Sequence, residues 1–530
     1  MKKLFSTWKQ DLPASFVVFF VALPLCLGIG LSSTSVPNHP EFQNIIAGVI
    51  AGVVGGVVVG FFSGSRLGVS GPAAGLITIV SAALLTMGSY ESFLVAVILA
   101  GLLQFIAGFL GAGVIGNYFP TSVIKGMLAG IGITLILKEI PHAFGYDKDF
   151  FGDESFLQPD GHNTFSELLY AFNALEIGAI IISVLSLAIL IGFEKPFLKK
   201  FALFKILPGS LFVVLLGVGL NEIFRVSSPD LFLNEKHLVA LPVASSMNEF
   251  FSFFKSPDFS ALANPQVYLI ALTLALVGSL ETLLSVEATD KLDTEHHITP
   301  TNRELKAQGI GNMVSGLIGG LPITQVIVRS SANINSGAKS KLSAILHGVF
   351  LVVLVALIPD ILNKIPLASL AAILFMVGYK LANIPLFKKK WSLGWDQFLP
   401  FIVTVLGILL TNLLYGIGMG IAVAIFFILR RNFHNDFQTT VEGDTKTIIL
   451  SEDVSFLNKG GILDELRKIK SDSKLRIDGS KCKSIDYDVL SELTDFINIT
   501  AKGDNIEVEL IKMPTKENIK HKTNYHEKVL

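Results

Sequence analysis

The sequence predicts an α-helical membrane protein whose helices form two inverted repeats of seven spans, followed by a small soluble α/β domain. Hydrophobic residues make up 51% of the 530 residues and charged residues only 16%, with a mean hydropathy of +0.60. A soluble domain usually has about a quarter charged residues. Apolar segments of the roughly 20 residues needed to cross a bilayer recur through most of the chain. Two segments rich in glycine and proline lie at matching positions in its two halves.

The remaining composition excludes several classes of protein. The formal net charge is −1, which gives no electrostatic basis for binding nucleic acid. Cys26 and Cys482 lie in unrelated regions, so we expect neither a disulfide framework nor a cysteine metal site. The sequence has no nucleotide-binding loop, metal-ligand cluster or nucleophile triad, and we therefore expect neither an enzyme nor a bound cofactor.

Fourteen segments have the composition of membrane spans, although the ninth and tenth are short. Beyond residue 436 the chain becomes polar with short alternating apolar runs, which is typical of a soluble domain. We therefore expect a membrane domain of residues 1–435 and a second domain of residues 436–530. The predicted spans are residues 14–34, 43–62, 70–87, 91–113, 121–140, 172–193, 206–222, 266–287, 305–320, 322–335, 342–359, 366–382, 396–413 and 414–430.

The loop charges agree with an even number of spans, which places both termini on one side of the membrane. Basic residues cluster at both ends of the membrane domain and in the loops after the sixth and twelfth spans. The loop of residues 141–170, on the opposite side, is acidic. The positive-inside rule then places both termini in the cytoplasm. The basic residues are Lys2, Lys3, Lys9, Lys195, Lys199, Lys200, Lys205, Lys388, Lys389, Lys390, Arg430 and Arg431.

The two segments rich in glycine and proline are separated by seven spans. The segment from Gly64 to Leu76 precedes the third span, and the segment from Gly319 to Asn333 precedes or forms the tenth. Repeats with an odd number of spans are inverted relative to each other. Paired segments of this kind mark the midplane substrate site of many transporters. The alternative is that glycine and proline are simply common in membrane helices.

Each of these segments is predicted to begin a half-helix whose free N–H groups point at a shared site, an arrangement that suits an anion. Gly71 and Pro72 fit the start of the first half-helix, because proline loses nothing at the first helical position. Ser70 would cap that helix. Ala73 and Ala74 are small, so a substrate can approach the backbone. The alternative is a tight helix-packing surface.

Arg329 lies near the start of the second half-helix, in the run Ile327, Val328, Arg329 and Ser330. Charge at membrane depth is costly and normally faces a cavity or pathway. The guanidinium would supply positive charge and directional donors to a small oxyanion. The alternative is a structural arginine paired with a carboxylate or with helix-end carbonyls.

Glu281 is a carboxylate inside the eighth predicted span. A buried carboxylate either takes up a proton or pairs with a cation, so Glu281 is a candidate for coupling transport to protons or to sodium. Ser285, four residues on, lies on the same helical face and would add an oxygen ligand for sodium. The alternative is a permanent ion pair with Arg329 or Lys138.

Several motifs resemble those of the SulP family of anion transporters, the prokaryotic relatives of the animal sulfate, chloride and bicarbonate exchangers. The most specific is Asn-Arg-Glu-Leu-x-x-Gln-Gly-x-x-Asn at residues 302–312, followed by Gly-Gly-Leu-Pro at residues 319–322. Asp-Leu-Pro-Ala at residues 11–14 and Leu-Pro-Leu at residues 23–25 resemble the first-span motif, and residues 64–72 resemble the third-span motif. The resemblance covers nearly the whole chain.

The resemblance implies 14 helices divided between a core and a gate domain, with an anion held between the third and tenth half-helices near Gly71-Pro72 and Val328–Ser330. The first and eighth spans would line the pocket, which brings Leu25 into the site. It also implies an elevator-like movement of the core, a homodimer, and a cytoplasmic STAS-like domain that can contact a cytoplasmic partner. The tail agrees, since residues 446–450 and 474–478 read as strands with a helix near residues 462–466.

Departures from the family pattern bear on the substrate. Many sulfate-type members have glutamine where Leu25 stands. The run from Gly278 to Ser285 resembles the cyanobacterial sodium–bicarbonate symporters of the family, which have aspartate where Glu281 stands. By this analogy Glu281 and Ser285 lie near a cation site. The longer glutamate side chain leaves sodium and proton both open as the coupling ion.

The predicted function is secondary active transport of a small inorganic anion across a bacterial inner membrane. Bicarbonate ranks ahead of sulfate, and cation-coupled symport ranks ahead of exchange. Two other functions stay open. One is a proton-coupled nucleobase or dicarboxylate carrier of the same architecture, and the other is a non-transporting membrane scaffold or sensor.

Overall fold

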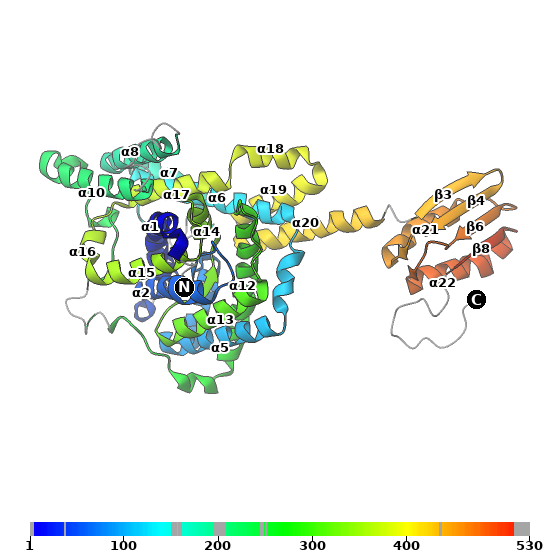
Figure 1. The fold of residues 1–530 in the computed structure, drawn as a ribbon, viewed down its shortest axis with the longest axis horizontal. Coiled ribbons are helices and arrows are strands. Elements are labelled where there is room, and N and C mark those ends of the chain that lie inside the picture. Colours follow the sequence, from blue (N-terminus) through cyan, green and yellow to red (C-terminus); the bar gives the residue numbers. More distant parts are fainter. Residues whose placement is uncertain are drawn as a thin grey trace. The chain divides into compact units, whose positions relative to one another are not determined.

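The computed structural model describes residues 5–36, 39–149, 156, 162–195, 208–243, 249, 252–433 and 437–513. The chain divides into two compact units, Met1–Ile421 and Ala422–Leu530, and the division falls within helix α20 (Leu413–Phe433). Figure 1 shows that the first unit is built of helices and that the larger sheet belongs to the second. Of the basic residues used for the topology, Lys2, Lys3, Lys199, Lys200, Lys205 and the side chain of Arg431 lie outside the described residues.

Each of the fourteen predicted spans overlaps a helix, although residues 206–207 of the seventh lie outside the described residues. Among the described residues, eight helices are long and apolar enough to cross a membrane, while the number of crossings stays a prediction. The helices of this unit are α1 (Trp8–Thr34), α2 (Ile46–Val54) continuing through η3 (Gly55–Val59) into α3 (Gly60–Phe62), α4 (Ile77–Met87), α5 (Tyr90–Phe109), α6 (Thr121–Phe144), α7 (Thr164–Asn173), α8 (Ile177–Glu194), α10 (Gly209–Ser227), α12 (Pro265–Leu292), α13 (Thr301–Leu317), α14 (Ile327–Asn335), α15 (Leu342–Leu357), α16 (Pro359–Leu362), α17 (Leu367–Leu381), α18 (Ile384–Ser392), α19 (Trp395–Leu410) and α20.

The third and tenth predicted spans contain half-helices, as the sequence predicts, and not continuous helices of spanning length. Helix α4 has 11 residues and α14 has 9, well short of the roughly 20 needed to cross a bilayer. Each follows a short strand, β1 (Ser70–Pro72) or β2 (Ile323–Gln325). The two strands pair antiparallel, with Ser70 opposite Gln325 and Pro72 opposite Ile323. The two half-helices therefore start from one paired element.

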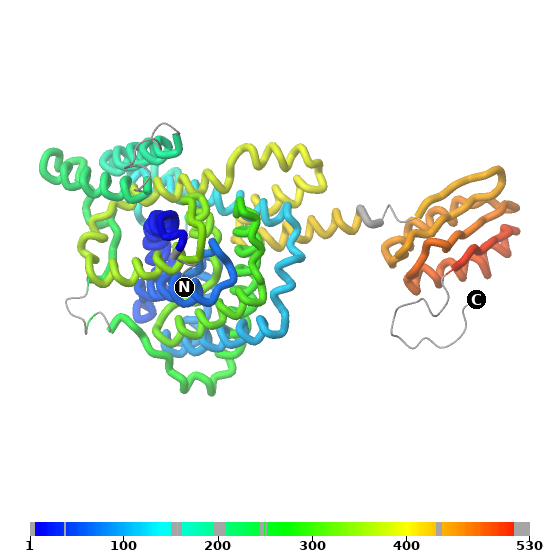
Figure 2. The backbone as a smooth tube through the Cα atoms, viewed as in Figure 1, coloured from blue at the N-terminus to red at the C-terminus, as the bar shows by residue number. Residues whose placement is uncertain are grey.

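The packing of the other helices shows two interleaved halves. Helix α5 is the fourth predicted span of the first half and packs against α12 and α13 of the second half. Helix α15 is the fourth predicted span of the second half and packs against α1 and α2 of the first half. Figure 2 shows blue first-half segments lying among green second-half segments. A second group of contacts joins α6 to α17 and α19, and α8 to α10 and α17. The assignment of these two groups of contacts to the expected core and gate stays a prediction.

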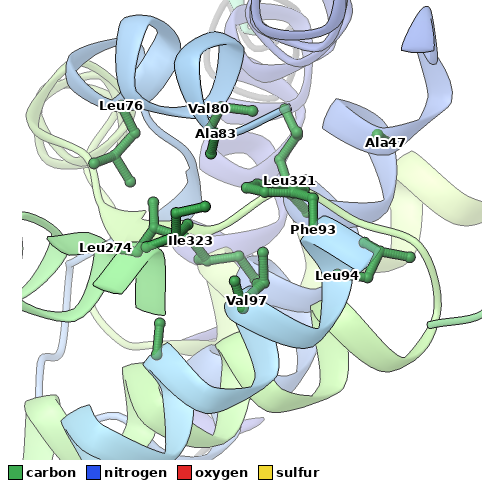
Figure 3. Packing of buried hydrophobic residues seen from close by; sticks show 14 of the residues in the cluster. Ala47, Leu76, Val80, Ala83, Phe93, Leu94, Val97, Leu274, Leu321 and Ile323 are labelled. Atoms are coloured by element: carbon green, nitrogen blue, oxygen red, sulfur yellow. The ribbon is translucent and has the colours of Figure 1, made fainter. Parts of the chain in front are cut away.

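A cluster of buried apolar side chains surrounds the strand pair. Leu321 and Ile323 lie among Phe93 and Val97 of α5 and Leu76 at the start of the first half-helix (Figure 3). Between membrane helices, close packing rather than exclusion of water supplies most of the attraction. The strand pair is therefore held by the complementary shapes of its neighbours, and its position depends on both halves of the chain.

The second unit contains a four-stranded sheet in the order β3-β4-β6-β8, with β3 and β4 antiparallel and the other pairs parallel. The predicted strands near residues 446–450 and 474–478 are confirmed as β4 and β6, and the predicted helix as α21. This arrangement is compatible with the expected STAS-like domain. The elements are β3 (Phe437–Glu442), β4 (Thr445–Leu450), β5 (Asp453–Val454), η10 (Phe456–Asn458), α21 (Lys459–Arg467), β6 (Lys474–Asp478), β7 (Ser484–Ile485), α22 (Tyr487–Asp495), η11 (Phe496–Thr500), α23 (Ala501–Gly503) and β8 (Glu507–Ile511).

A buried aspartate joins two distant segments beyond the end of α6. Asp147 Oδ1 lies 2.6 Å from His142 Nδ1, and Asp147 Oδ2 lies 2.7 Å from His237 Nδ1 in η8 (Glu235–His237). Burial alone would raise the pKa of Asp147, but the hydrogen bonds from the two histidines outweigh it and hold that pKa below its ordinary value. The hydrogen bond to Asp147 likewise raises the pKa of His237. The link is therefore strongest with the imidazole protonated and the carboxylate ionised.

This link predicts a pH-dependent contribution to stability. The contribution of His237 is complete below its ordinary pKa of 6.5 and declines as pH rises through the raised value. The contribution of Asp147 to stability is complete above pH 3.8, the ordinary pKa of aspartate. It is lost as the pH falls through the lowered pKa of Asp147. We expect His237→Gln to lower the melting temperature of the purified protein more near pH 6 than near pH 10.

The control for this measurement is His39→Gln, because His39 pairs with Glu41 at an exposed position. It should change the melting temperature little at either pH, since exposed pairs contribute little. An equal loss at both pH values for His237→Gln would show that the charge of the imidazole does not hold the link.

Candidate functional site

A small cavity lies where the two half-helices begin. Its volume is about 30 Å³, enough for one or a few water-sized molecules. Helices from both packing groups contribute side chains to its wall. The lining residues are Leu25 and Ile29 of α1, Pro72 and Ala74 at the first half-helix, Met127 and Ile131 of α6, Glu281, Leu284 and Ser285 of α12, Val326, Ile327, Val328 and Arg329 at the second half-helix, and Leu413, Leu414 and Ile417 of α20.

Eight of the eleven residues predicted for the site line this cavity: Leu25, Pro72, Ala74, Glu281, Ser285, Ile327, Val328 and Arg329. The other three lie behind its wall. Gly71 is part of β1, and Ala73 packs in the apolar cluster around the strands. Ser330 Oγ donates to the Val326 carbonyl (2.7 Å) and accepts from the Val69 N–H (3.0 Å). The structure brings these residues together, and their roles as ligands stay predictions.

Another part of the cavity wall was not predicted from the sequence. It consists of apolar side chains from α6 and α20, namely Met127, Ile131, Leu413, Leu414 and Ile417. Residues of these types are ordinary in any membrane helix, so no signal in the sequence distinguishes them. Among the described residues that line the cavity, those with polar side chains are Glu281, Ser285 and Arg329.

The two sides of the site are built alike. Ala73 follows β1 with φ −110° and ψ 129°, and Val326 follows β2 with φ −115° and ψ 129°. Helical structure begins at the next residue in each case, and neither helix start has a side-chain cap. The first N–H groups of a helix have no acceptor within the helix. Both half-helices thus present donors and the positive end of a helix dipole at the cavity.

The expected helix start at Gly71-Pro72 is wrong by two to three residues. Pro72 lies in β1, and helical structure begins at Ala74, in η4 (Ala74–Leu76). Ser70 does not cap the helix, because its Oγ accepts a hydrogen bond from Gln308 Nε2 (2.7 Å). Pairing with β2 fixes residues 70–72 as a strand, so a contact between the two halves of the chain outweighs the local preference of proline for a helix start.

The motif at residues 302–312 holds the strand pair in place. Glu304, Gln308 and Asn312 are spaced by four residues and so share one face of α13. Glu304 accepts hydrogen bonds from Ser63 Oγ (2.5 Å) and from the Gly64 N–H (3.1 Å). Asn312 donates to the Ile323 carbonyl (3.0 Å) and accepts from the Ile323 N–H (2.6 Å). This motif therefore acts on the geometry of the site from behind.

Arg329 is buried, with 1% of its surface exposed. An ideal Cβ placed on Gly71 would lie 2.0 Å from Arg329 Nη1, so the guanidinium packs directly on the backbone of β1. Neither Nη1 nor Nη2 has a hydrogen-bond acceptor among the described residues. The prediction that Arg329 grips an anion with these directional donors stays a prediction. Its unpaired charge lies behind the strand, where a low dielectric lets it act over several ångströms.

Glu281 occupies the other side of the first half-helix. Its carboxylate lies against Gly75, because an ideal Cβ on that glycine would lie 3.2 Å from each of its oxygens. Gly75 is in the first turn of the half-helix, where the dipole favours negative charge. Ser285 lies one turn further along α12 and also lines the cavity. Lys138, an alternative partner for Glu281, lies 3.9 Å from Asp149 and 4.0 Å from Glu167.

A comparison with protein families identifies this architecture. The model of the sulfate permease family matches residues 8–404, which include both half-helices, the motif of α13 and the residues of α12 at the cavity. This chain belongs to the sulfate permease family. The resemblance to the SulP family is thereby confirmed, and the protein is an anion transporter of that family.

Individual relatives agree with this assignment. The putative sulfate transporter YvdB of Bacillus subtilis is 28% identical to this chain. The match covers 80% of this chain and 74% of the length of YvdB. The bicarbonate transporter BicA of Picosynechococcus is 27% identical over 86% of this chain and 77% of its own. The solved transmembrane domain of a cyanobacterial BicA has a TM-score of 0.54 at 23% identity, covering 79% of this chain and 98% of that domain. The structure of SLC26A9 has a TM-score of 0.66 at 13% sequence identity. The match covers 96% of this chain and 84% of the SLC26A9 chain.

The contact between Gly71 and Arg329 predicts a strong effect of a single methyl group. A Cβ at position 71 would overlap Nη1 at 2.0 Å, so Gly71→Ala must displace the guanidinium from behind β1. We expect Gly71→Ala to reduce anion uptake by about tenfold or more, equivalent to ~1.4 kcal/mol. Initial rates in proteoliposomes containing equal amounts of folded protein would measure this.

Gly219→Ala is the matched control. No atom lies within 4 Å of an ideal Cβ at Gly219, so this variant adds the same methyl group to a helix without a collision. It should transport at the wild-type rate. Unchanged uptake by Gly71→Ala would show that the placement of Arg329 does not matter for the site.

Proposed function

We propose that this protein is a secondary active transporter that carries a small inorganic anion, bicarbonate in preference to sulfate, together with a cation. The observation that carries the proposal is the meeting of two uncapped half-helix starts at one cavity, with the unpaired charge of Arg329 behind them. Backbone N–H groups and helix dipoles of this kind favour an anion. The positive charge of Arg329 at this cavity favours an anion over a neutral nucleobase.

The charges around the cavity support a monovalent substrate. Arg329 supplies one positive charge, and Glu281, when ionised, supplies one negative charge. Moving a dianion from water into such a site costs far more desolvation energy than moving a monoanion, and the cost must be recovered from charges and donors in the site. Bicarbonate therefore suits the site better than sulfate does. The relatives include proteins named for each of these anions.

Glu281 supports coupling to a cation. The ionised carboxylate lies at the start of the first half-helix, where it would repel an incoming anion. A sodium ion or a proton on Glu281 would remove that repulsion, and by linkage each ligand would then strengthen the binding of the other. Glu281 and Ser285 offer carboxylate and hydroxyl oxygens, the donors that hard cations prefer.

The two packing groups support an elevator-like movement. The half-helices, α1 and α12 form one side of the cavity, and apolar side chains of α6 and α20 form the other. An apolar wall makes few directional contacts with the opposite group, so the core could slide along it while carrying the site. We further propose a homodimer in a bacterial inner membrane, with both termini in the cytoplasm and the STAS-like domain available to a cytoplasmic partner.

Uptake of labelled anions tests the proposed substrate. We expect bicarbonate uptake into a transport-deficient host to exceed sulfate uptake and to increase with sodium or with a proton gradient. Arg329→Ala should reduce uptake about tenfold, because it removes the positive charge behind the site. Lack of uptake of both anions would contradict the substrate assignment. Saturable uracil uptake that Arg329→Ala leaves intact would instead support a nucleobase carrier.

A neutral residue at position 281 tests the coupling. Glu281→Gln keeps the length of the side chain but removes the charge, so anion binding should persist while its dependence on sodium or pH disappears. Binding measured by thermal stabilisation, with and without sodium and at several pH values, would show this. Glu91→Gln is the control, because Glu91 is partly exposed and lies 3.8 Å from Lys255, and it is not among the residues that line the cavity. Cation dependence that survives in Glu281→Gln would contradict the role of this carboxylate.

A further inference from the structure

Four lysines from three helices converge away from the anion cavity. Lys125 is in the second turn of α6, Lys291 in the last turn of α12, and Lys389 and Lys390 are in α18. The positive charges of Lys291 and Lys389 repel that of Lys125. Lys390 is likewise repelled by the charges of Lys125, Lys291 and Lys389. Lys291 Nζ also lies 3.4 Å from Thr121 Oγ1, which joins the end of α12 to the start of α6. We call these four residues the lysine cluster.

The positive charge of the lysine cluster is only partly balanced. Lys291 pairs with Glu287 at 2.9 Å. Within the described part of the chain, no carboxylate lies within ion-pair distance of Lys125, Lys389 or Lys390. Lys390 is nevertheless only 5% exposed. The like-charged neighbours of Lys390 repel its ammonium group, and this repulsion is not balanced by a carboxylate of the described residues. The cluster is therefore suited to an anion that the chain does not itself supply.

The surroundings of the cluster are those of a membrane surface. Trp391 and Trp395, which follow Lys390, are 59% and 61% exposed and contact each other edge to face. Exposed tryptophans are typical of the level of lipid headgroups. Helix α18 lies between α17 and α19 in the chain, and Figure 1 shows it as the short helix that connects them. Exposed Ile384 and Leu393 flank the three consecutive lysines of α18 with apolar surface.

We propose that the lysine cluster binds the phosphate of an anionic phospholipid headgroup. Basic pockets between membrane helices are known to hold such headgroups. The exposed tryptophans and apolar side chains beside the lysines favour a lipid over a free anion, because they give its acyl chains a surface to contact. The headgroup reduces the repulsion among the four ammonium groups and accepts hydrogen bonds from lysines of α6, α12 and α18 together.

The bound headgroup would connect the two groups of helices. Lys291 belongs to α12 in the group with the half-helices, whereas Lys125 belongs to α6 in the other group. A phosphate shared between them stabilises the arrangement in which they are close, and so opposes relative movement of the two groups. This regulatory consequence rests on the proposed transport function, but the binding of the lipid does not.

Thermal unfolding of the full-length protein in detergent tests the binding, with added phosphatidylglycerol compared with phosphatidylcholine. A ligand that binds only the folded protein raises its melting temperature. We expect phosphatidylglycerol to do so and phosphatidylcholine not to. Lys125→Gln and Lys389→Gln should each weaken the apparent affinity for phosphatidylglycerol about fivefold. These two positions are less buried than Lys390, so their variants are expected to fold.

Lys388→Gln is the matched control. Lys388 is exposed on the same helix and is not among the charges that act on Lys390, so this variant should bind phosphatidylglycerol like the wild type. Equal stabilisation by both lipids, or an unchanged affinity in Lys125→Gln and Lys389→Gln, would overturn the proposal. Stabilisation by inorganic phosphate alone, with the same dependence on lysines, would assign the cluster to a soluble anion instead. None of these outcomes depends on whether the protein transports an anion.

Discussion

The pairing of β1 with β2 is the constraint on which the rest of the membrane unit depends. A bilayer offers no water to satisfy backbone N–H and C=O groups, so a non-helical segment is tolerated only where protein or a cavity surrounds it. Here two three-residue strands satisfy each other, and side chains of α13 bond to both. The donors left over are those at the first turns of the half-helices, which open onto the cavity. The interruption of the helices is thus also the origin of the site.

The strand pair also explains how two buried side chains of opposite charge come to line one cavity. Gly71 and Gly75 are four residues apart, and each accommodates a charged group against the backbone, Arg329 behind β1 and Glu281 beside the first turn. In the proposed mechanism, the arginine would raise the affinity for an anion wherever the anion lies in the site. The carboxylate would lower that affinity until a cation neutralises it. Opposed charges held by one short segment therefore provide a physical basis for coupling anion to cation.

Much of this organisation could be predicted from the sequence, because apolar length and the positions of glycine and proline are local signals. They placed each predicted span on a helix and brought Glu281 and Arg329 to one site. The strands could not be predicted, since residues 70–72 pair with residues far away in the chain and their local pattern favours a helix start. The direction of the Arg329 side chain depends on the space over Gly71, and the apolar wall from α6 and α20 carries no distinguishing residue type. Both are properties of the tertiary packing.

The most direct test of this account is an experimental structure of the protein with bound anion. We predict density for the anion in the cavity, within hydrogen-bond distance of the free N–H groups at the starts of the two half-helices, near Ala74 and Val328. The guanidinium of Arg329 should remain behind β1, against Gly71. An anion bound elsewhere, or held directly by an Arg329 side chain that has left Gly71, would contradict the claim that the paired half-helices form the site.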